Sequence, residues 1–306
     1  MAVIDTGLTV AGLRSEFFDR FDQVPTVWQD LATQYASTKD VEHHKWLGTV
    51  PQMREWGTGR LAKGLRTESY DVANLKYEST IEVDRDEISD DQTGQIRIRV
   101  NELARRAALH KDQMIADLLK NGTAAGFLSY DGQTFFSDSH VSGASGTQDN
   151  NLSLTIADTD KNAFTSAEGK AALQNAITQM LAFKDDQGEP MDLQPSGLTI
   201  VCPPGQFYRW LEIVNASVIN NTSNILSGVA RVVQFPRLTT AGEWFLLKTD
   251  EYIRPFLVQD REPIEFGQIA EGSEQDFLRE KWLFGVRARY RVAYGEWRFG
   301  VRTVLA

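Results

Sequence analysis

The sequence predicts an α+β fold, and three observations lead to that prediction. Apolar residues recur at helical spacing over residues 8–24 and again over residues 93–121. From Leu75 to Asp84, apolar Leu75, Tyr77, Ile81 and Val83 alternate with polar and charged residues, which is typical of a half-buried strand. From Val229 onward the chain reads mostly as separate strand segments. Helices and strands combined in this way indicate the α+β class.

The N-terminal segment predicts an amphipathic helix followed by a connector. Leu13 and Phe17 share one face of residues 8–24, and Pro25 ends the pattern. The polar face carries acidic as well as basic residues, whereas a helix on a membrane surface is usually rich in Lys and Arg. We therefore expect a docked arm. Residues 39–66 show little periodicity, so we expect an irregular connector anchored by tryptophans.

The next segment predicts a two-stranded ribbon. In the strand Leu75–Asp84, charged residues occupy the face opposite Tyr77 and Val83. The preceding segment Leu65–Val72 can supply an antiparallel partner, with the turn near Ala73-Asn74. An isolated ribbon of two strands is marginally stable in water, so we expect this one to lie against another surface.

Residues 93–121 predict one long helix. Asp90 and Asp91 offer N-terminal caps, and Asn121-Gly122 is a typical C-terminal signal. The helix would be roughly 40 Å long, which is more than a small domain needs. We therefore expect it to act as a structural spine.

The second half of the chain predicts further helices and strands. A helix over residues 165–184 is closed by Gly188 and Pro190. A short buried strand, Leu198–Cys202, precedes Pro203-Pro204, which open a third helix. The remaining expected strands are Val229–Phe235, Trp244–Lys248, Pro255–Gln259, Trp282–Tyr294 and Trp297–Leu305.

Composition excludes several classes of protein. The chain has 306 residues, a formal net charge of −10 and a single cysteine, so no internal disulfide can form. The acidic balance argues against general affinity for nucleic acids, because phosphate contacts need an excess of Lys and Arg. No apolar run approaches the roughly 20 residues that span a bilayer, so we expect no membrane partner.

Charge is distributed unevenly. Residues 93–121 carry six basic and three acidic side chains, and residues 276–306 carry seven and three, whereas residues 131–195 carry three and ten. Patches of opposite sign can pair within one subunit or between copies, and the sequence leaves both possibilities open.

One strand has a basic face, on which Arg287, Arg289 and Arg291 alternate with apolar residues. Contact with nucleic acid is one interpretation. Pairing with acidic strands of the same or a neighbouring subunit is the simpler one.

Another segment carries residues suited to hydrolysis. Asp138 and His140 alternate onto one side, and Asp131 can fold back toward them, as a metal-dependent hydrolase would require. The plainer interpretation is a hairpin that turns at Asp131-Gly132 and is anchored by the phenylalanines after it. No further ligand stands at a recognisable spacing. We expect no catalytic residue, metal or cofactor, and the hydrolase is the less favoured alternative.

Four groups of residues follow one another along the chain in an order that matches a known protein family. They are Trp46-Leu47-Gly48 with Pro51 and Arg54-Glu55-Trp56; Asn74, Tyr77-Glu78, Ile81, Val83, Arg85 and Ile88 with Asp90-Asp91; Asp131-Gly132-Gln133-Thr134-Phe135-Phe136 with His140; and Gly285-Val286-Arg287-Ala288-Arg289 with Tyr294-Gly295 and Trp297. Together they resemble the major head subunit family of Mu-like tailed bacteriophages. Gly295-Glu296-Trp297 departs from the Gly-Phe-Trp of that family, which indicates a distant member.

The resemblance implies the HK-type tailed-phage major capsid fold. Its parts would be the N-terminal arm and connector (1–64), the extended β-hairpin loop (65–92), the peripheral domain (93–159) with the spine helix (93–121), the axial domain (160–250) and the C-terminal strands that return to the peripheral and axial domains (251–306).

The resemblance also implies a structural protein, not an enzyme. Such a major capsid protein self-assembles through pentamers and hexamers into an icosahedral shell that encloses double-stranded DNA without binding a specific sequence. Its partners would be copies of itself and, further, scaffold, portal and decoration proteins. It would be assembled in the cytoplasm of the bacterial host and end in the virion. A nanocompartment shell protein of the same fold is an alternative.

By analogy with the extended loop of the family, five residues are expected to make contacts between subunits. They are Trp56, Arg60, Tyr77, Glu78 and Arg85.

Overall fold

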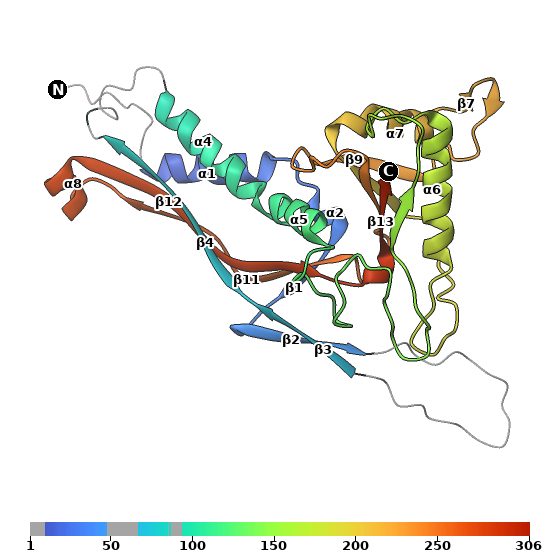
Figure 1. Ribbon diagram of the computed structural model, residues 1–306. Helices are drawn as coiled ribbons and strands as arrows, with labels where there is room; N and C mark the ends of the chain where they lie inside the picture. Colours follow the sequence, from blue (N-terminus) through green and yellow to red (C-terminus); the bar gives the residue numbers. More distant parts are fainter. Residues whose placement is uncertain (1–9, 48–66, 85, 87–93) are drawn as a thin grey trace.

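The computed structural model describes residues 10–47, 67–84, 86 and 94–306 (Figure 1). Its helices are α1 (Val10–Gln23), α2 (Trp28–Leu31), α4 (Gln95–Ala108), α5 (His110–Asn121), α6 (Ser166–Leu181), α7 (Phe207–Asn215) and α8 (Glu274–Arg279), with short 3-10 turns at Pro204–Gln206 and Trp297–Phe299. Its strands are β1 (Ala32–Ala36), β2 (Val41–Leu47), β3 (Thr67–Ala73), β4 (Leu75–Asp84), β5 (Asn151–Leu154), β6 (Leu198–Cys202), β7 (Val218–Ile219), β8 (Thr222–Ser223), β9 (Ala230–Gln234), β10 (Glu243–Lys248), β11 (Phe256–Ile269), β12 (Lys281–Tyr294) and β13 (Gly300–Leu305). The α+β prediction is confirmed. Within the described ranges, none of the helices has the length and apolar character needed to cross a membrane.

The strands form two main sheets and two small ribbons. The first sheet has the order β1-β11-β12-β4, and the second has the order β5-β13-β10-β6-β9. The ribbons are β2 with β3 and β7 with β8. Strands β11 and β12 are the longest, and Figure 1 shows them running from the far tip of the first sheet to its junction with the second.

Helices α1, α4 and α5 cover one face of the first sheet (Figure 1). Leu13 and Phe17 of α1 are almost fully buried in a cluster that includes Val100 of α4 and Phe284 of β12. The ring of Phe17 lies 5.1 Å from that of Phe266 in β11. Burying a side chain of this size contributes about 1.5–3 kcal/mol. The predicted docked arm is therefore a helix bound to its own subunit.

The second sheet is enclosed by apolar residues. Every residue of β6 and β10 is buried, so both faces of these strands are covered. The buried charges at the two ends of β10 are paired, Glu243 with Arg302 and Lys248 with Asp250. Helix α6 begins with a capping box formed by Thr165 and Glu168. The predicted helix over residues 165–184, the strand Leu198–Cys202 and the helix after Pro203-Pro204 are confirmed.

Aromatic residues join the two sheets. Phe135 stacks on Tyr294 at the end of β12, with ring centroids 4.3 Å apart, and Phe136 lies 5.2 Å from Phe245 of β10. Both phenylalanines follow a turn in which Gly132 adopts a φ of 80°, a value that favours glycine. The hairpin anchored by phenylalanines is confirmed.

The predicted spine is a broken helix. Helix α4 ends at Ala108 and α5 begins at His110, with Leu109 between them at φ −79° and ψ −2°. Backbone bonds continue across the break, because the Leu109 amide donates to the Arg105 carbonyl at 3.1 Å. The end at Asn121 is confirmed, while the expected caps Asp90 and Asp91 lie outside the described residues.

The predicted pairing of the ribbon is wrong. Strand β4 pairs with β12, and β3 pairs with β2, a strand inside the segment 39–66 that was expected to be irregular. Buried Asn74 explains the separation, because its side-chain amide donates to the Ser37 hydroxyl and to the Lys39 carbonyl, both at 2.8 Å. These bonds fix the chain at Asn74, where it passes from β3 in the small ribbon to β4 in the first sheet, so β3 and β4 do not form a hairpin.

A buried carboxylate of the spine holds the start of α2. Asp112 of α5 accepts hydrogen bonds from the backbone amides of Val27, at 3.1 Å, and Trp28, at 2.7 Å, at the start of α2. It therefore caps a helix from a distant part of the chain. Burial raises the pKa of this carboxyl group, and the two amide bonds oppose that effect.

Asp112→Ala should destabilise the subunit by about 1–3 kcal/mol, because two amides at the start of α2 lose their acceptor. The free energy of unfolding, measured by denaturant titration of the unassembled chain, checks this. Asp117→Ala removes an exposed carboxylate from the same helix and should change it little. Equal stability of the Asp112→Ala and wild-type proteins would contradict the assignment.

Candidate intersubunit site

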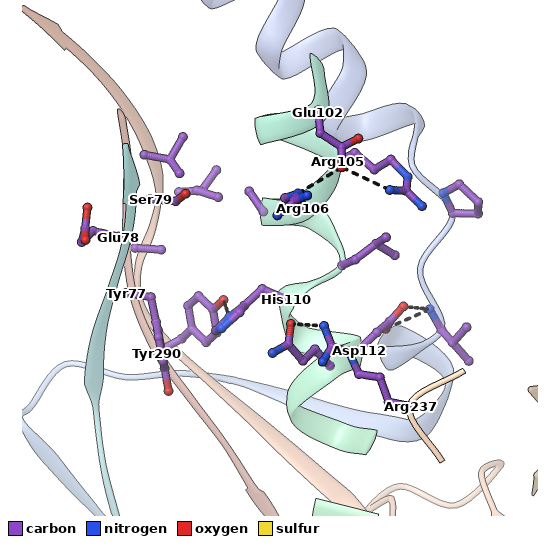
Figure 2. A pocket seen from close by; sticks show the side chains of 18 of the residues that line it. Tyr77, Glu78, Ser79, Glu102, Arg105, Arg106, His110, Asp112, Arg237 and Tyr290 are labelled. Atoms are coloured by element: carbon purple, nitrogen blue, oxygen red, sulfur yellow. Dashed lines mark hydrogen bonds and ion pairs between the residues drawn. The ribbon is translucent and has the colours of Figure 1, made fainter. Parts of the chain in front are cut away.

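A groove lies between the spine and the first sheet, and Figure 2 shows its two walls. Its volume is about 740 Å³. Its lining includes Tyr77 and Tyr290 on the sheet side and Arg105, Arg106, His110 and Arg237 on the opposite side. This groove is called the helix-sheet groove below.

An aromatic cluster closes one end of the helix-sheet groove. His110, the first residue after the break in the spine, lies 4.7 Å from Tyr77 between ring centroids and shares a 2.5 Å hydrogen bond with the Tyr290 hydroxyl. Burial lowers the pKa of His110, and the nearby charge of Arg237 lowers it further. The cluster fixes the break in the spine against the sheet.

Arginines dominate the helical wall. Arg106 and Arg105 both contact Glu102, at 3.0 Å and 3.5 Å, one helical turn away. The hydrogen bond from Arg106 lowers the pKa of Glu102. Arg237 donates to the Gln113 side chain at 2.7 Å from the loop after β9. Two of these arginines share a single carboxylate, so the wall keeps a basic character.

The basic face of β12 has its counter-charges in the same subunit. Arg287 lies 2.8 Å from Glu262 of β11, and Arg289 bonds Asp40 and lies 3.6 Å from Glu262. The simpler expectation, pairing with acidic residues, is confirmed for these two arginines. Carboxylates already occupy their guanidinium groups, so a phosphate would have to displace them.

The structure places two of the five expected contact residues. Tyr77 is half-buried in the aromatic cluster, and Glu78 is exposed beside it at the groove. Trp56, Arg60 and Arg85 lie outside the described residues. The sequence did not single out four residues that line the groove: Arg105, Arg106, His110 and Arg237. The excess of basic residues over 93–121 was the signal that indicated the two arginines of the spine.

The three residues of the hydrolase alternative do not form a catalytic or metal site. Asp131 and His140 do meet, with 2.6 Å between Oδ2 and Nδ1, and both side chains are buried. Asp138 is exposed, so the expectation that it shares a side with His140 is wrong. The ring of His140 instead stacks on Trp297 at 4.0 Å. Across the described parts of the chain, no three His, Cys, Asp or Glu residues gather as metal ligands.

The architecture defines a class of protein. A sheet that carries a long broken helix and continues into a second, helix-flanked sheet is the fold of tailed-phage capsid subunits. The procapsid of bacteriophage JBD30 matches this chain with a TM-score of 0.55 and 22% identity, over 97% of this chain and 75% of that chain. An identity this low establishes the fold alone.

The family follows from sequence. The profile of the family described as Mu-like prophage major head subunit gpT matches residues 8–167, 161–238 and 239–304, and the chain belongs to this family. The Mu-like prophage FluMu major head subunit of Haemophilus influenzae is 22% identical over 290 residues, which are 94% of this chain and 69% of that protein. The major capsid protein of Escherichia phage Mu is 31% identical over 127 residues, which are 42% of this chain and 41% of that protein. The chain is therefore a structural capsid subunit and not an enzyme.

His110 should make stability depend on pH. Because its pKa is lowered in the folded state, the unfolded chain binds more protons at mildly acidic pH, and stability falls as the pH drops below about 6.5. His110→Gln removes this titration, so its loss of stability between about pH 7.5 and about pH 5 should be smaller than that of the wild type. Thermal unfolding at both pH values measures the difference. Equal losses in the two proteins would contradict the prediction.

His140→Ala should destabilise the subunit strongly, by about 3 kcal/mol or more, because the buried Asp131 carboxylate loses its partner. Denaturant titration measures the cost, and elemental analysis of the purified wild type should find no stoichiometric metal. An ion that is bound by the wild type and lost with His140→Ala would favour the hydrolase instead.

Proposed function

We propose that the chain assembles through pentamers and hexamers into an icosahedral head that encloses double-stranded DNA. The β2-β3 ribbon carries this proposal. It forms a two-stranded sheet of its own outside both main sheets (Figure 1), and such a ribbon is marginally stable alone. Its base is bound to the first sheet, because the Gln259 side-chain amide of β11 donates to the Val72 carbonyl at 3.1 Å. Neighbouring copies supply a surface for the rest of the ribbon.

Repeated contact between copies supplies the strength of the shell. Obligate interfaces bury about 2,000 Å² or more, and most of the gross gain is offset by ordering and lost rigid-body freedom. A modest surplus at each of many contacts makes a shell that is slow to dismantle. The contacts join different patches head to tail, which closes into rings.

The charge of the subunit supports a container role. The net charge of −10 repels phosphate, and the arginines Arg287 and Arg289 of β12 are paired with carboxylates of the same chain. A wall of this kind surrounds DNA without binding a particular sequence. Scaffold, portal and decoration proteins complete the proposed set of partners, and assembly takes place in the host cytoplasm.

The division into functional parts belongs to the same proposal. It comprises the arm and connector (1–64), the extended loop (65–92), the peripheral domain (93–159), the axial domain (160–250) and the returning strands (251–306). The second sheet draws β5 and β13 from outside residues 160–250, which ties the proposed axial domain to its flanks. We propose Trp56, Arg60, Tyr77, Glu78 and Arg85 as residues that contact neighbouring copies.

Charge reversal at Glu78 or Arg85 should block assembly and leave the subunit folded. Because Glu78 is exposed, Glu78→Lys should cost little in stability, about 1 kcal/mol or less. Negative-stain electron microscopy of the expressed full chain measures the particles, and circular dichroism checks the fold. Glu189→Lys, at an exposed site in the other part of the molecule, should assemble normally.

Two outcomes would contradict the proposal. A wild-type chain that stays monomeric under all assembly conditions would refute the proposal that it forms a shell. Small particles that carry an enzyme cargo would instead indicate a nanocompartment. Normal particles from Glu78→Lys and Arg85→Glu would remove these two residues from the set of contacts.

A further inference from the structure

The far tip of the β11-β12 pair exposes large apolar side chains. Phe277 and Leu278 of α8 are 87% and 65% exposed, and Ile269 at the end of β11 is 44% exposed. Large apolar groups that are exposed together mark an interaction surface. These three residues are called the apolar tip below.

Hydrogen bonds hold the apolar tip in one orientation. The Ser273 hydroxyl accepts from the Asp276 amide at 3.2 Å and caps α8. Asp276 is buried, and its carboxylate accepts from the Gly272 amide and from the Trp282 indole, both at 3.0 Å. The exposure of Phe277 is therefore a built feature of the tip and not the fraying of a chain end.

The subunit cannot cover its own apolar tip with its own groove. Strand β12 starts at the tip with Lys281 and first reaches the helix-sheet groove at Val286, a distance of about 17 Å at the usual rise of a strand. Figure 1 shows α8 at the left end of the β11-β12 pair, beyond the other described helices. A strand paired on both sides does not fold back, so the groove of the same subunit does not reach the tip.

The helix-sheet groove complements the apolar tip in apolar character and in charge. Its lining includes apolar Leu109, Ile264 and Val286. At its helical wall, the side chains of Arg105 and Arg106 are 51% and 77% exposed.

The tip carries the opposite charge. Three exposed glutamates surround the apolar tip: Glu271, Glu274 and Glu280. Arg279 is exposed beside them and carries the opposite charge. Acidic groups around an apolar centre complement a basic rim around an apolar floor.

We propose that the apolar tip of one subunit binds in the helix-sheet groove of a second copy, with its glutamates against Arg105 and Arg106. This contact rests on the proposed function, since it requires many copies at high local concentration. Each subunit offers one tip and one groove, so the contact is heterologous and extends from copy to copy instead of closing a pair. It also gives a role to two of the six basic side chains in residues 93–121, Arg105 and Arg106.

Truncation of the aromatic anchor tests the apolar half of the contact. Phe277→Ser should raise the subunit concentration needed for assembly by about tenfold or more, as loss of a central aromatic anchor does. Tyr252→Ser is the matched control, because Tyr252 is 91% exposed and lies outside the tip. The assembly threshold, measured by light scattering, should stay unchanged in the control. An unchanged threshold for Phe277→Ser would overturn the proposal.

Exchanging the charges of the tip and the groove tests the polar half of the proposed contact. The pair Arg105→Glu and Arg106→Glu should impair assembly, as should the pair Glu274→Arg and Glu280→Arg. A chain that carries all four substitutions should recover, because complementary signs meet again at every contact. Lys120→Glu, on the exposed side of α5 outside the groove, is the matched control. Failure of the fourfold variant to recover, in a chain that folds normally, would overturn the pairing.

Cross-linking tests the contact directly and separates it from the shell itself. Leu278→Cys with Arg106→Cys should give a ladder of covalent multimers under oxidation, whereas each single variant should not. The native thiol does not interfere, since Cys202 is buried and burial raises its pKa to about 12. Shells that form without any ladder would overturn this contact and leave the proposed function standing, whereas a wild type that forms no shells would overturn both.

Discussion

The pairing of β11 with β12 is the interaction on which the rest of the subunit depends. Their pairing runs from Phe256 opposite Tyr294 to Ile269 opposite Leu283, with shifts of register between Asp260 and Glu265. One end joins the aromatic cluster between the two sheets, the middle forms a wall of the helix-sheet groove, and the other end carries α8. A hydrogen-bonded ladder of this length keeps those three places at fixed separations.

The spine depends on the same pair of strands. Its break at Leu109 is held by His110 against Tyr290 of β12, and Lys111 bonds Asp260 of β11 at 2.7 Å. The arm in turn depends on the spine, because Asp112 caps α2. Any movement of the spine relative to the sheet must therefore disturb the aromatic cluster and the attachment of the arm together.

The uneven charge of the chain has two different outcomes in the fold. On the open face of β12, Arg287 and Arg289 meet carboxylates of β11 and of the segment before β2, so their charge is neutralised within the subunit. On the spine, Arg105 and Arg106 share Glu102 alone and stay largely exposed. Positive charge is therefore neutralised at Arg287 and Arg289 of β12 and stays accessible to solvent at Arg105 and Arg106 of the spine.

The sequence by itself determined the elements with a clear apolar pattern: the arm helix, the strand Leu75–Asp84, the helical spine without its break, and β6 with its following helix. Hydrophobic burial imposes these periods locally, so they are visible without any partner. The tertiary structure alone decided that β3 pairs with β2, that Asp131 and His140 form a buried pair beside Trp297, and that His110 and Arg237 reach one groove. Strand β2 carries charged and histidine side chains without alternation, and the groove unites residues more than 100 positions apart. Pairing and convergence over such separations depend on which surfaces meet in three dimensions, and local spacing carries no record of that choice.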